Sequence, residues 1–469
     1  MQTTPVVVAN LKIGMFVAEL DRPWSETPFL TDGFRIVEAD QLEVLRAYCR
    51  RVFIDPLRSS PESLSHLGDL RGKKNQADWD EGTPFEPALS RIFPEWKGRS
   101  ASAISMWQGM AARVRHFVDQ RVLSAIGKGR VTRRAGSRSP AVPRGMTLWV
   151  YRDVRGAKGE VSRARPLFQH TERLLAALLI EVSAGKPVEL KALSDAADGM
   201  VKSVIANPQP LLWLAMIRTL GAKPTSHAMK VAVQLLAFGR SLGFDTVPLK
   251  RLAMIGLLID VGKARVNPSI LKKPEALNPE ELAEVRRHVE LGLEALGGHD
   301  TLEDDTYRGI SEYHERLDGS GYPKGLKGDE IGLFGRMAAI VDSFATLITR
   351  RSYAPAMSAL DAMRVLYAGA DAGFSKQLIE DFLAALGIYP IGSLVELASG
   401  EIGMVLAQTP AHQLRPRLLL LTDADKLPRP ARPIDLLSNP VDRNDHVMRI
   451  ERGLPYGAYN IDPRRFQLG

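Results

Sequence analysis

Apolar residues recur at helical spacing in one segment after another through the middle of the chain. Side chains three and four positions apart lie on the same face of a helix, so each such segment predicts a helix with one buried face. Asn278-Pro279 has the residue types of a helix start. The predicted helices cover residues 167–182, 192–205, 211–220, 227–241, 249–260, 279–288, 334–348 and 359–368. Together they predict an all-α domain over residues 166–388.

The N-terminal part has a different pattern, in which short β-branched runs alternate loosely with polar residues. Residues 6–17, 31–36 and 51–55 favour strands, and a short amphipathic helix follows Asp40. We therefore expect a small α/β domain over residues 1–58. The following residues, 59–165, are polar and turn-rich, and they are interpreted as a linker region with one helix, 101–126, and a basic segment.

The C-terminal part consists of short apolar runs separated by Gly, Pro and polar turns. The runs at 391–397, 402–407 and 417–421 predict a small β-rich module over residues 389–469. The fold class expected for the whole chain is multidomain and mainly α, with a small α/β domain before the helices and a β-rich module after them.

Composition places the chain among soluble globular proteins, with 469 residues, 45% hydrophobic and 25% charged. The longest apolar runs fall well short of the roughly 20 residues that span a bilayer, so no transmembrane segment is expected. The first residues show no signal-peptide pattern. A single cysteine, Cys49, excludes an intramolecular disulfide and fits a reducing compartment. The expected location is the cytoplasm.

Basic residues are concentrated in one segment of the predicted linker region. Twelve Lys or Arg and two acidic residues lie between Arg121 and Arg165, whereas the whole chain has a net charge of +8. This segment is interpreted as a solvated linker, with a patch for an anionic partner or a tether to acidic lipids as alternatives. Because no aromatic residues are interleaved in the manner of nucleic-acid motifs, nucleic acid is not an expected partner.

Five potential metal ligands lie at similar intervals along the predicted helices. They are His227, Asp260, His288, His314 and Asp342, separated by 33, 28, 26 and 28 residues. One ligand per helix is the arrangement of metal sites inside helical bundles. A carboxylate at the end of an apolar helix is costly to bury unless it is paired or binds a metal, and Asp260 and Asp342 both have this context. Each residue alone would be an ordinary core histidine or helix-terminal aspartate; together they indicate a metal site.

Two motifs in the same region carry a family resemblance. Residues 257–263 read Leu-Leu-Ile-Asp-Val-Gly-Lys, and residues 313–323 read Tyr-His-Glu-Arg-Leu-Asp-Gly-Ser-Gly-Tyr-Pro. They resemble the signature motifs of the HD-GYP family of metal-dependent cyclic di-GMP phosphodiesterases, and the likeness extends over roughly residues 201–386. The first 55 residues or so resemble a small α/β domain often found ahead of such domains. The resemblance implies a helical core that holds two or three ions, typically iron or manganese.

The resemblance also implies roles for individual residues. The metal ligands would be His227, Asp260, His288, His314 and Asp342, with Asp260 shared between ions. Lys263 would contact the scissile phosphate, which makes Asp260 and Lys263 the candidate catalytic residues, and Lys263 and Arg351 the candidate substrate-binding residues. The loop at Gly321, Tyr322 and Pro323 would lie beside the pocket and contact signalling partners such as diguanylate cyclase domains. The ordinary alternative for this loop is a simple stack of turns.

The chain departs from the family pattern at five positions. Ile259 and Tyr313 each stand where the family has a histidine ligand; the isoleucine cannot bind a metal, and the tyrosine is neutral near pH 7. Lys223 stands where members with three ions have a glutamate. Ala345 and Ala354 replace a polar and a basic residue near the substrate.

Counting ligands shows what would remain after these replacements. One metal position would keep His227, Asp260 and Asp342, and the other Asp260, His288 and His314. Three protein ligands plus water suffice in catalytic zinc sites, so an ion can still bind, although the loss of even an indirect partner costs about 10–100-fold in affinity or activity.

We therefore expect a degenerate HD-GYP protein that binds cyclic di-GMP or a signalling partner, with weak or no hydrolysis. The alternatives are an active phosphodiesterase with a reduced metal site and a purely structural interaction module that contacts an anionic partner.

Overall fold

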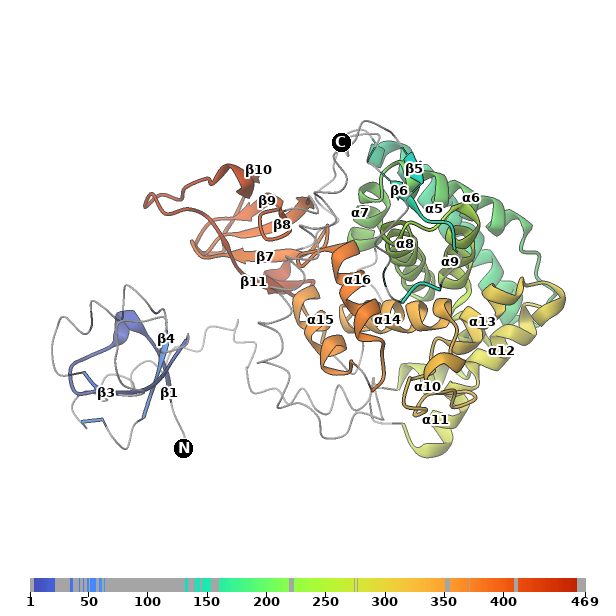
Figure 1. The fold of residues 1–469 in the computed structure, drawn as a ribbon, viewed down its shortest axis with the longest axis horizontal. Coiled ribbons are helices and arrows are strands. Elements are labelled where there is room, and N and C mark those ends of the chain that lie inside the picture. Colours follow the sequence, from blue (N-terminus) through green and yellow to red (C-terminus); the bar gives the residue numbers. More distant parts are fainter. Residues whose placement is uncertain are drawn as a thin grey trace. The chain divides into compact units, whose positions relative to one another are not determined.

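The computed structural model (Figure 1) describes the helical and C-terminal parts almost completely and the N-terminal part partially. Two compact units, Met1–Thr83 and Pro84–Gly469, are described separately below. The predicted helix 101–126, most of the basic segment, Arg351 and Ala354 lie outside the described residues. The described residues are 4–21, 34–36, 51–55, 160–218, 223–273, 275, 277–350, 355–370, 372–408 and 412–461, with single positions or short runs between 42 and 63 and between 131 and 153.

The first unit contains a small antiparallel sheet, as the N-terminal pattern predicts. In spatial order its strands are β1 (Thr4–Val7), β4 (Arg51–Ile54), β2 (Phe16–Leu20) and β3 (Phe34–Arg35), and the 3-10 turn η1 (Val8–Asn10) follows β1. Its core is formed by aliphatic side chains such as Val17, Val52 and Ile54, all fully buried.

The second unit is mainly helical. Its helices are α5 (Glu160–Ser183), α6 (Lys191–Ala206), α7 (Gln209–Arg218), α8 (Pro224–Leu242), α9 (Thr246–Leu258), α10 (Pro268–Lys272), α11 (Pro279–Arg286), α12 (His288–Ala295), α13 (Asp304–Glu312), α14 (Leu333–Leu347), α15 (Ala359–Ala368) and α16 (Lys376–Leu386). The 3-10 turns η5 (Val261–Arg265), η6 (Gly298–Asp300) and η7 (Gly328–Glu330) lie between them, and a two-stranded ribbon, β5 (Val131–Arg133) and β6 (Trp149–Tyr151), precedes them. Helix α8 is buried around most of its circumference because α5, α6, α7, α9, α14 and α16 all pack against it.

Two of the differences between the predicted and the observed helix boundaries affect the site. Helix α9 ends at Leu258, and Asp260 adopts φ −110° and ψ 12°, so the chain leaves the helix before the aspartate. The helix expected to run through His288 is divided at Arg287 into α11 and α12. The start of α11 is as predicted, with Asn278 and Glu281 forming a reciprocal capping box.

The C-terminal strands form one antiparallel sheet beside the helices (Figure 1). Its order is β10 (Pro428–Asp435), β9 (Arg417–Thr422), β8 (Ile402–Ala407), β7 (Leu394–Leu397) and β11 (Ile450–Leu454), with the 3-10 turns η9 (Leu436–Ser438) and η10 (Ala458–Asn460). Its apolar face continues the core of the helices without a break. The predicted fold class is therefore confirmed.

None of the helices within the described residues combines the length and the apolar character that a bilayer span requires.

Candidate metal centre

The five predicted ligands converge from five different elements. His227 lies in the first turn of α8, Asp260 between α9 and η5, and His288 at the start of α12. His314 follows α13, and Asp342 lies within α14. Their ligand atoms form two groups that share Asp260, and within each group these atoms lie within 4.8 Å of one another. One group is His227, Asp260 and Asp342; the other is Asp260, His288 and His314.

A close backbone contact brings Asp260 and His288 together. At Gly262, a Cβ atom would lie only 1.9 Å from the carbonyl oxygen of His288 and 2.4 Å from the amide nitrogen of Gly292. Because no side chain fits there, η5 can cross α12 at backbone distance. The glycine two residues after Asp260 thus determines where the aspartate meets the histidine.

In the first group, each carboxylate already lies against a basic side chain. His227 Nε2 lies 2.8 Å from Asp342 Oδ1 and 3.8 Å from Asp260 Oδ2. Lys263 Nζ donates a hydrogen bond of 2.7 Å to the same Asp260 oxygen. Asp260 and Asp342 are each 7% exposed, so both carboxylates are held out of solvent with a cationic or imidazole partner.

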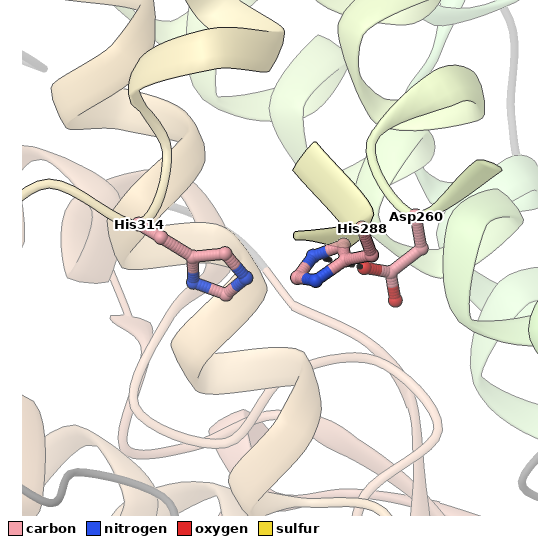
Figure 2. Close-up of side chains that lie close together, drawn as sticks. All are labelled: Asp260, His288 and His314. Atoms are coloured by element: carbon pink, nitrogen blue, oxygen red, sulfur yellow. Dashed lines mark ion pairs between the residues drawn. The ribbon is translucent and has the colours of Figure 1, made fainter. Parts of the chain in front are cut away.

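In the second group, a tyrosine hydroxyl lies between two of the ligand atoms. Figure 2 shows His288 next to Asp260, with His314 facing them from the other side. The Tyr313 hydroxyl lies 2.5 Å from His288 Nε2 and 3.1 Å from Asp260 Oδ1, and these two atoms are 3.7 Å apart. Tyr313 is fully buried. The Tyr313 hydroxyl is therefore within hydrogen-bonding distance of both neighbouring side chains, and its one hydrogen can be donated to either of them.

Burial and charge shift the pKa values of these groups. Burial lowers the pKa of His288 to about 4, with a further decrease from Lys263 that Asp260 opposes. Burial also holds the pKa of His314 well below its ordinary value and raises that of Tyr313 well above it. Burial alone would raise the pKa of Asp260, but Lys263, His227 and His288 outweigh this effect and lower it. The carboxylate is therefore ionised beside neutral imidazoles at neutral pH.

The arrangement fits a metal ion. His288 Nδ1 lies 2.5 Å from the carbonyl oxygen of Val285, to which it donates, so that Nε2 keeps its lone pair toward Asp260. Among the described residues, the buried atoms His314 Nε2 and His227 Nδ1 have no hydrogen-bond partner. Neutral imidazoles with carboxylates form the donor set that suits manganese, iron or zinc.

The other departures are placed as follows. Ile259 is 2% exposed at the end of α9 and offers no ligand atom to the pocket. Ala345 is fully buried in α14, one turn beyond Asp342. Lys223 is exposed and precedes α8 as its N-cap residue.

The GYP loop (residues 319–323) packs directly beside the second group. Glu315 holds the following segment, since its carboxylate accepts hydrogen bonds from the amides of Lys324, at 2.7 Å, and Leu326, at 3.0 Å. The amide of Tyr322 donates to the carbonyl oxygen of His314 at 3.2 Å, and the peptide bond between Tyr322 and Pro323 is cis.

Several residues that build the site were not predicted from the sequence. Gly262 contacts the backbone of His288, and Arg286 lies over the ring of Tyr322, so both act through segments more than 20 positions away. Glu315 instead binds amides 9 and 11 positions after it. Glu315 is 2% exposed, so its carboxylate needs hydrogen-bond donors nearby. In the sequence, its position next to Tyr313 and His314 was the available sign of such a role. No pattern in the sequence pairs Gly262 with α12.

Comparisons with known proteins agree on the class of protein. The family described as HD domain matches residues 215–377, and a domain of unknown function (DUF3391) matches residues 4–193. A cyclic di-GMP phosphodiesterase of Pseudomonas aeruginosa is 30% identical over 304 residues, which cover 65% of this chain and 73% of the relative.

Two further relatives cover shorter stretches. A cyclic di-GMP phosphodiesterase response regulator of Xanthomonas campestris is 34% identical over 30% of this chain and 38% of its own length. A 3'3'-cGAMP-specific phosphodiesterase of Vibrio cholerae is 35% identical over 30% and 32%. A solved structure of an HDG"Y"P protein from Bdellovibrio bacteriovorus matches with a TM-score of 0.40 and 14% identity, over 81% of this chain and 98% of the other.

Proposed function

The chain belongs to the HD-GYP family, and on this premise we propose that it binds cyclic di-GMP as a regulatory or effector protein with weak or no hydrolysis. The nucleotide is the one named for relatives that are 30–34% identical to this chain. The pocket around Asp260 would receive it, with iron or manganese as the ion. The predicted location in the cytoplasm agrees with a single, buried cysteine, Cys49.

One observation carries the proposal of weak hydrolysis. The Tyr313 hydroxyl lies 2.5 Å from His288 Nε2 and 3.1 Å from Asp260 Oδ1, the two atoms through which the second group would hold an ion. An ion there must compete with a buried hydroxyl that is already in place, and Ile259 gives the first group no compensating ligand. A loosely held second ion weakens phosphodiester hydrolysis, which uses two ions for different tasks.

The chain's own residues would bind the phosphates. Lys263 is 25% exposed while its ammonium touches Asp260, so it can reach a phosphate at the pocket mouth by rotating its flexible stem. Arg351 would add a second cation, as predicted, although it lies outside the described residues. A bound ion would supply activation of water near neutral pH and polarisation of a phosphoryl oxygen.

Two measurements test this proposal. Isothermal calorimetry with cyclic di-GMP, with and without Mn²⁺ or Fe²⁺, should show binding that Lys263→Met weakens. An anaerobic hydrolysis assay with the same ions should show turnover at or near the blank. Absence of nucleotide binding would contradict the proposal that the chain binds cyclic di-GMP. Turnover at a rate typical of enzymes, about 1 s⁻¹ or more, would contradict the proposal of weak or no hydrolysis.

The alternative is an active phosphodiesterase with a reduced metal site. It is favoured by the geometry of the ligands, because all five predicted residues gather into two groups around Asp260. Here Asp260 would hold the ions present, and Lys263 would neutralise the phosphate. Turnover that Asp260→Ala abolishes would establish this alternative.

For the GYP loop we propose contact with a signalling protein, such as a diguanylate cyclase domain. The loop lies partly exposed at the protein surface, as Ser320 shows, and Lys324, which follows it directly, is exposed and held by Glu315. Loss of binding to a diguanylate cyclase domain in a Lys324→Glu variant would support this proposal. Unchanged binding would contradict a role of the GYP loop in that contact.

A further inference from the structure

The tyrosine of the GYP loop packs against two planar groups. Its ring is stacked on the imidazole of His314, with centroids 4.5 Å apart and planes inclined by 25°. The guanidinium carbon of Arg286, at the end of α11, lies 5.0 Å from the centroid of the same ring. Arg286 and His314 thus both pack against the ring of Tyr322.

Backbone hydrogen bonds hold Tyr322 and the residues after it in place. The amide of Tyr322 donates to the carbonyl oxygen of His314, and Glu315 binds the amides that follow the loop. The Nε atom of Arg286 is buried and has no hydrogen-bond partner among the residues that the structure describes. Its contact with an aromatic face is therefore the interaction that explains its position.

His314 depends on this contact for its orientation. Its buried Nε2 has no hydrogen-bond partner within the described part of the chain, whereas His288 is oriented by a carbonyl oxygen. Metal-binding histidines need such support, because a ring free to rotate loses affinity for the ion. For His314 the support comes from aromatic neighbours, Tyr322 on one side and Tyr313 at a centroid distance of 3.9 Å.

We propose that Tyr322 is a positioning residue for His314 and that Arg286 clamps Tyr322 in place. A change in the GYP loop would then alter the affinity of the second ligand group for an ion. The part of this inference that concerns the ion rests on the proposed function; the part that concerns the orientation of His314 does not.

The orientation is tested in the metal-free protein by NMR of labelled histidines, of which the chain has nine. The His314 signal is assigned with a His314→Gln variant. The Tyr322 ring current displaces this signal, so Tyr322→Leu should move it toward the position of a free imidazole, and Tyr322→Phe should restore it. Arg286→Gln should move it in the same direction, whereas Arg287→Gln, at the exposed neighbouring position, should leave it in place. An unmoved signal in Tyr322→Leu would overturn the proposal.

The coupling to the ion is tested by Mn²⁺ calorimetry on the same set of proteins. Tyr322→Leu and Arg286→Gln should weaken binding by about 10–100-fold, the usual cost of losing an orienting partner, while Tyr322→Phe and Arg287→Gln should bind like the unsubstituted chain. Equal affinities throughout would overturn the coupling. If no protein of the set bound an ion, the proposed metal site would fail, and the NMR measurement would still decide whether Tyr322 positions His314.

Discussion

At the scale of single residues, Tyr313 has the clearest effect on the chemistry of the pocket. From the sequence it counts as a lost ligand; in the structure its hydroxyl lies against two atoms through which an ion would be held, His288 Nε2 and Asp260 Oδ1. An ion that binds there must therefore compete with this hydroxyl. Lys263 lies against the other oxygen of Asp260 in the same way. Both carboxylate oxygens of Asp260 thus have a protein partner that an ion would have to displace or share.

Restoring a histidine at this position should strengthen ion binding. In Tyr313→His the competing hydroxyl is removed and an imidazole donor is added beside Asp260 and His288. We expect Mn²⁺ affinity to rise by about 10–100-fold or a second ion to bind, as measured by calorimetry and elemental analysis. Tyr307→His, elsewhere on α13, should change neither quantity. Equal binding by the two variants would show that Tyr313 does not limit occupancy.

The lowered pKa of His288 makes the stability of the metal-free protein dependent on pH. The folded chain binds this proton only near pH 4, whereas the unfolded chain binds it near pH 6.5. Between these values the unfolded state holds more protons, so the free energy of unfolding falls as the pH drops, by up to about 3 kcal/mol. Urea unfolding with EDTA present at pH 7, 6, 5 and 4 should show this loss. His288→Gln should flatten the dependence, and an unchanged slope would contradict the prediction.

At the scale of elements, the helical pattern in the sequence was a reliable guide where apolar faces are wide. Helix α15 has the predicted bounds, and α6, α8 and α14 begin and end within three residues of their predictions. Helices α10, α13 and α16 were not predicted; the sequence of α13 is acidic and has few apolar residues, whereas α16 has a buried apolar face that the prediction missed. Strands β10 and β11 were also missed, since β10 is rich in Pro and Arg and largely exposed.

That the candidate residues lie together was predictable from the sequence, whereas the geometry of their contacts was not. The spacing of His227, Asp260 and Asp342 along apolar helices was enough to place them in one pocket. The contacts that define the pocket's chemistry depend on how distant segments approach one another. Tyr313 reaches Asp260 across 53 positions, and Tyr322 stacks on His314 because the loop folds back. Local patterns carry no information about such approaches.

The crossing of η5 and α12 gives a prediction at this scale. In Gly262→Ala the new methyl group meets backbone atoms of His288 and Gly292 at 1.9–2.4 Å, and backbone cannot yield as a side chain can. We expect the free energy of unfolding to fall by at least about 3 kcal/mol, the upper end of the cost of overpacking. Mn²⁺ binding should also weaken. Gly292→Ala has its nearest contacts at 3.1–3.2 Å and should cost less. Thermal unfolding of both variants checks the order, and the reverse order would contradict it.

At the scale of the whole molecule, the C-terminal sheet is part of the unit that contains the pocket. Buried side chains of β7, β8 and β9 continue the core formed by the helices. Gly392, just before β7, lies against Met216 of α7, where a Cβ atom would come within 2.8 Å of the Met216 Cβ. The sheet therefore supports the helical bundle directly.

Two glycines of the C-terminal module test this support. Gly392 and Gly457 both have positive φ, +86° and +83°, so alanine at either position costs about 1–2 kcal/mol in backbone strain. In Gly392→Ala the new methyl group also collides with Met216, which lowers the free energy of unfolding by about 1–3 kcal/mol more. Thermal unfolding followed by circular dichroism should show a larger decrease in Tm for Gly392→Ala than for Gly457→Ala. Equal decreases would mean that the sheet does not support α7.

Tyr313, His314 and Glu315 are consecutive, yet each serves a different part of the protein. The first bonds to Asp260, the second belongs to the ligand group, and the third holds the amides that follow the GYP loop. The three residues follow the end of α13 in a turn in which the Glu315 amide donates to the carbonyl oxygen of Glu312. Inserting or deleting one residue in this turn would change which side chain faces each partner. The pocket can therefore exchange one side chain for another here, as Tyr313 illustrates, but it cannot accommodate a change in chain length.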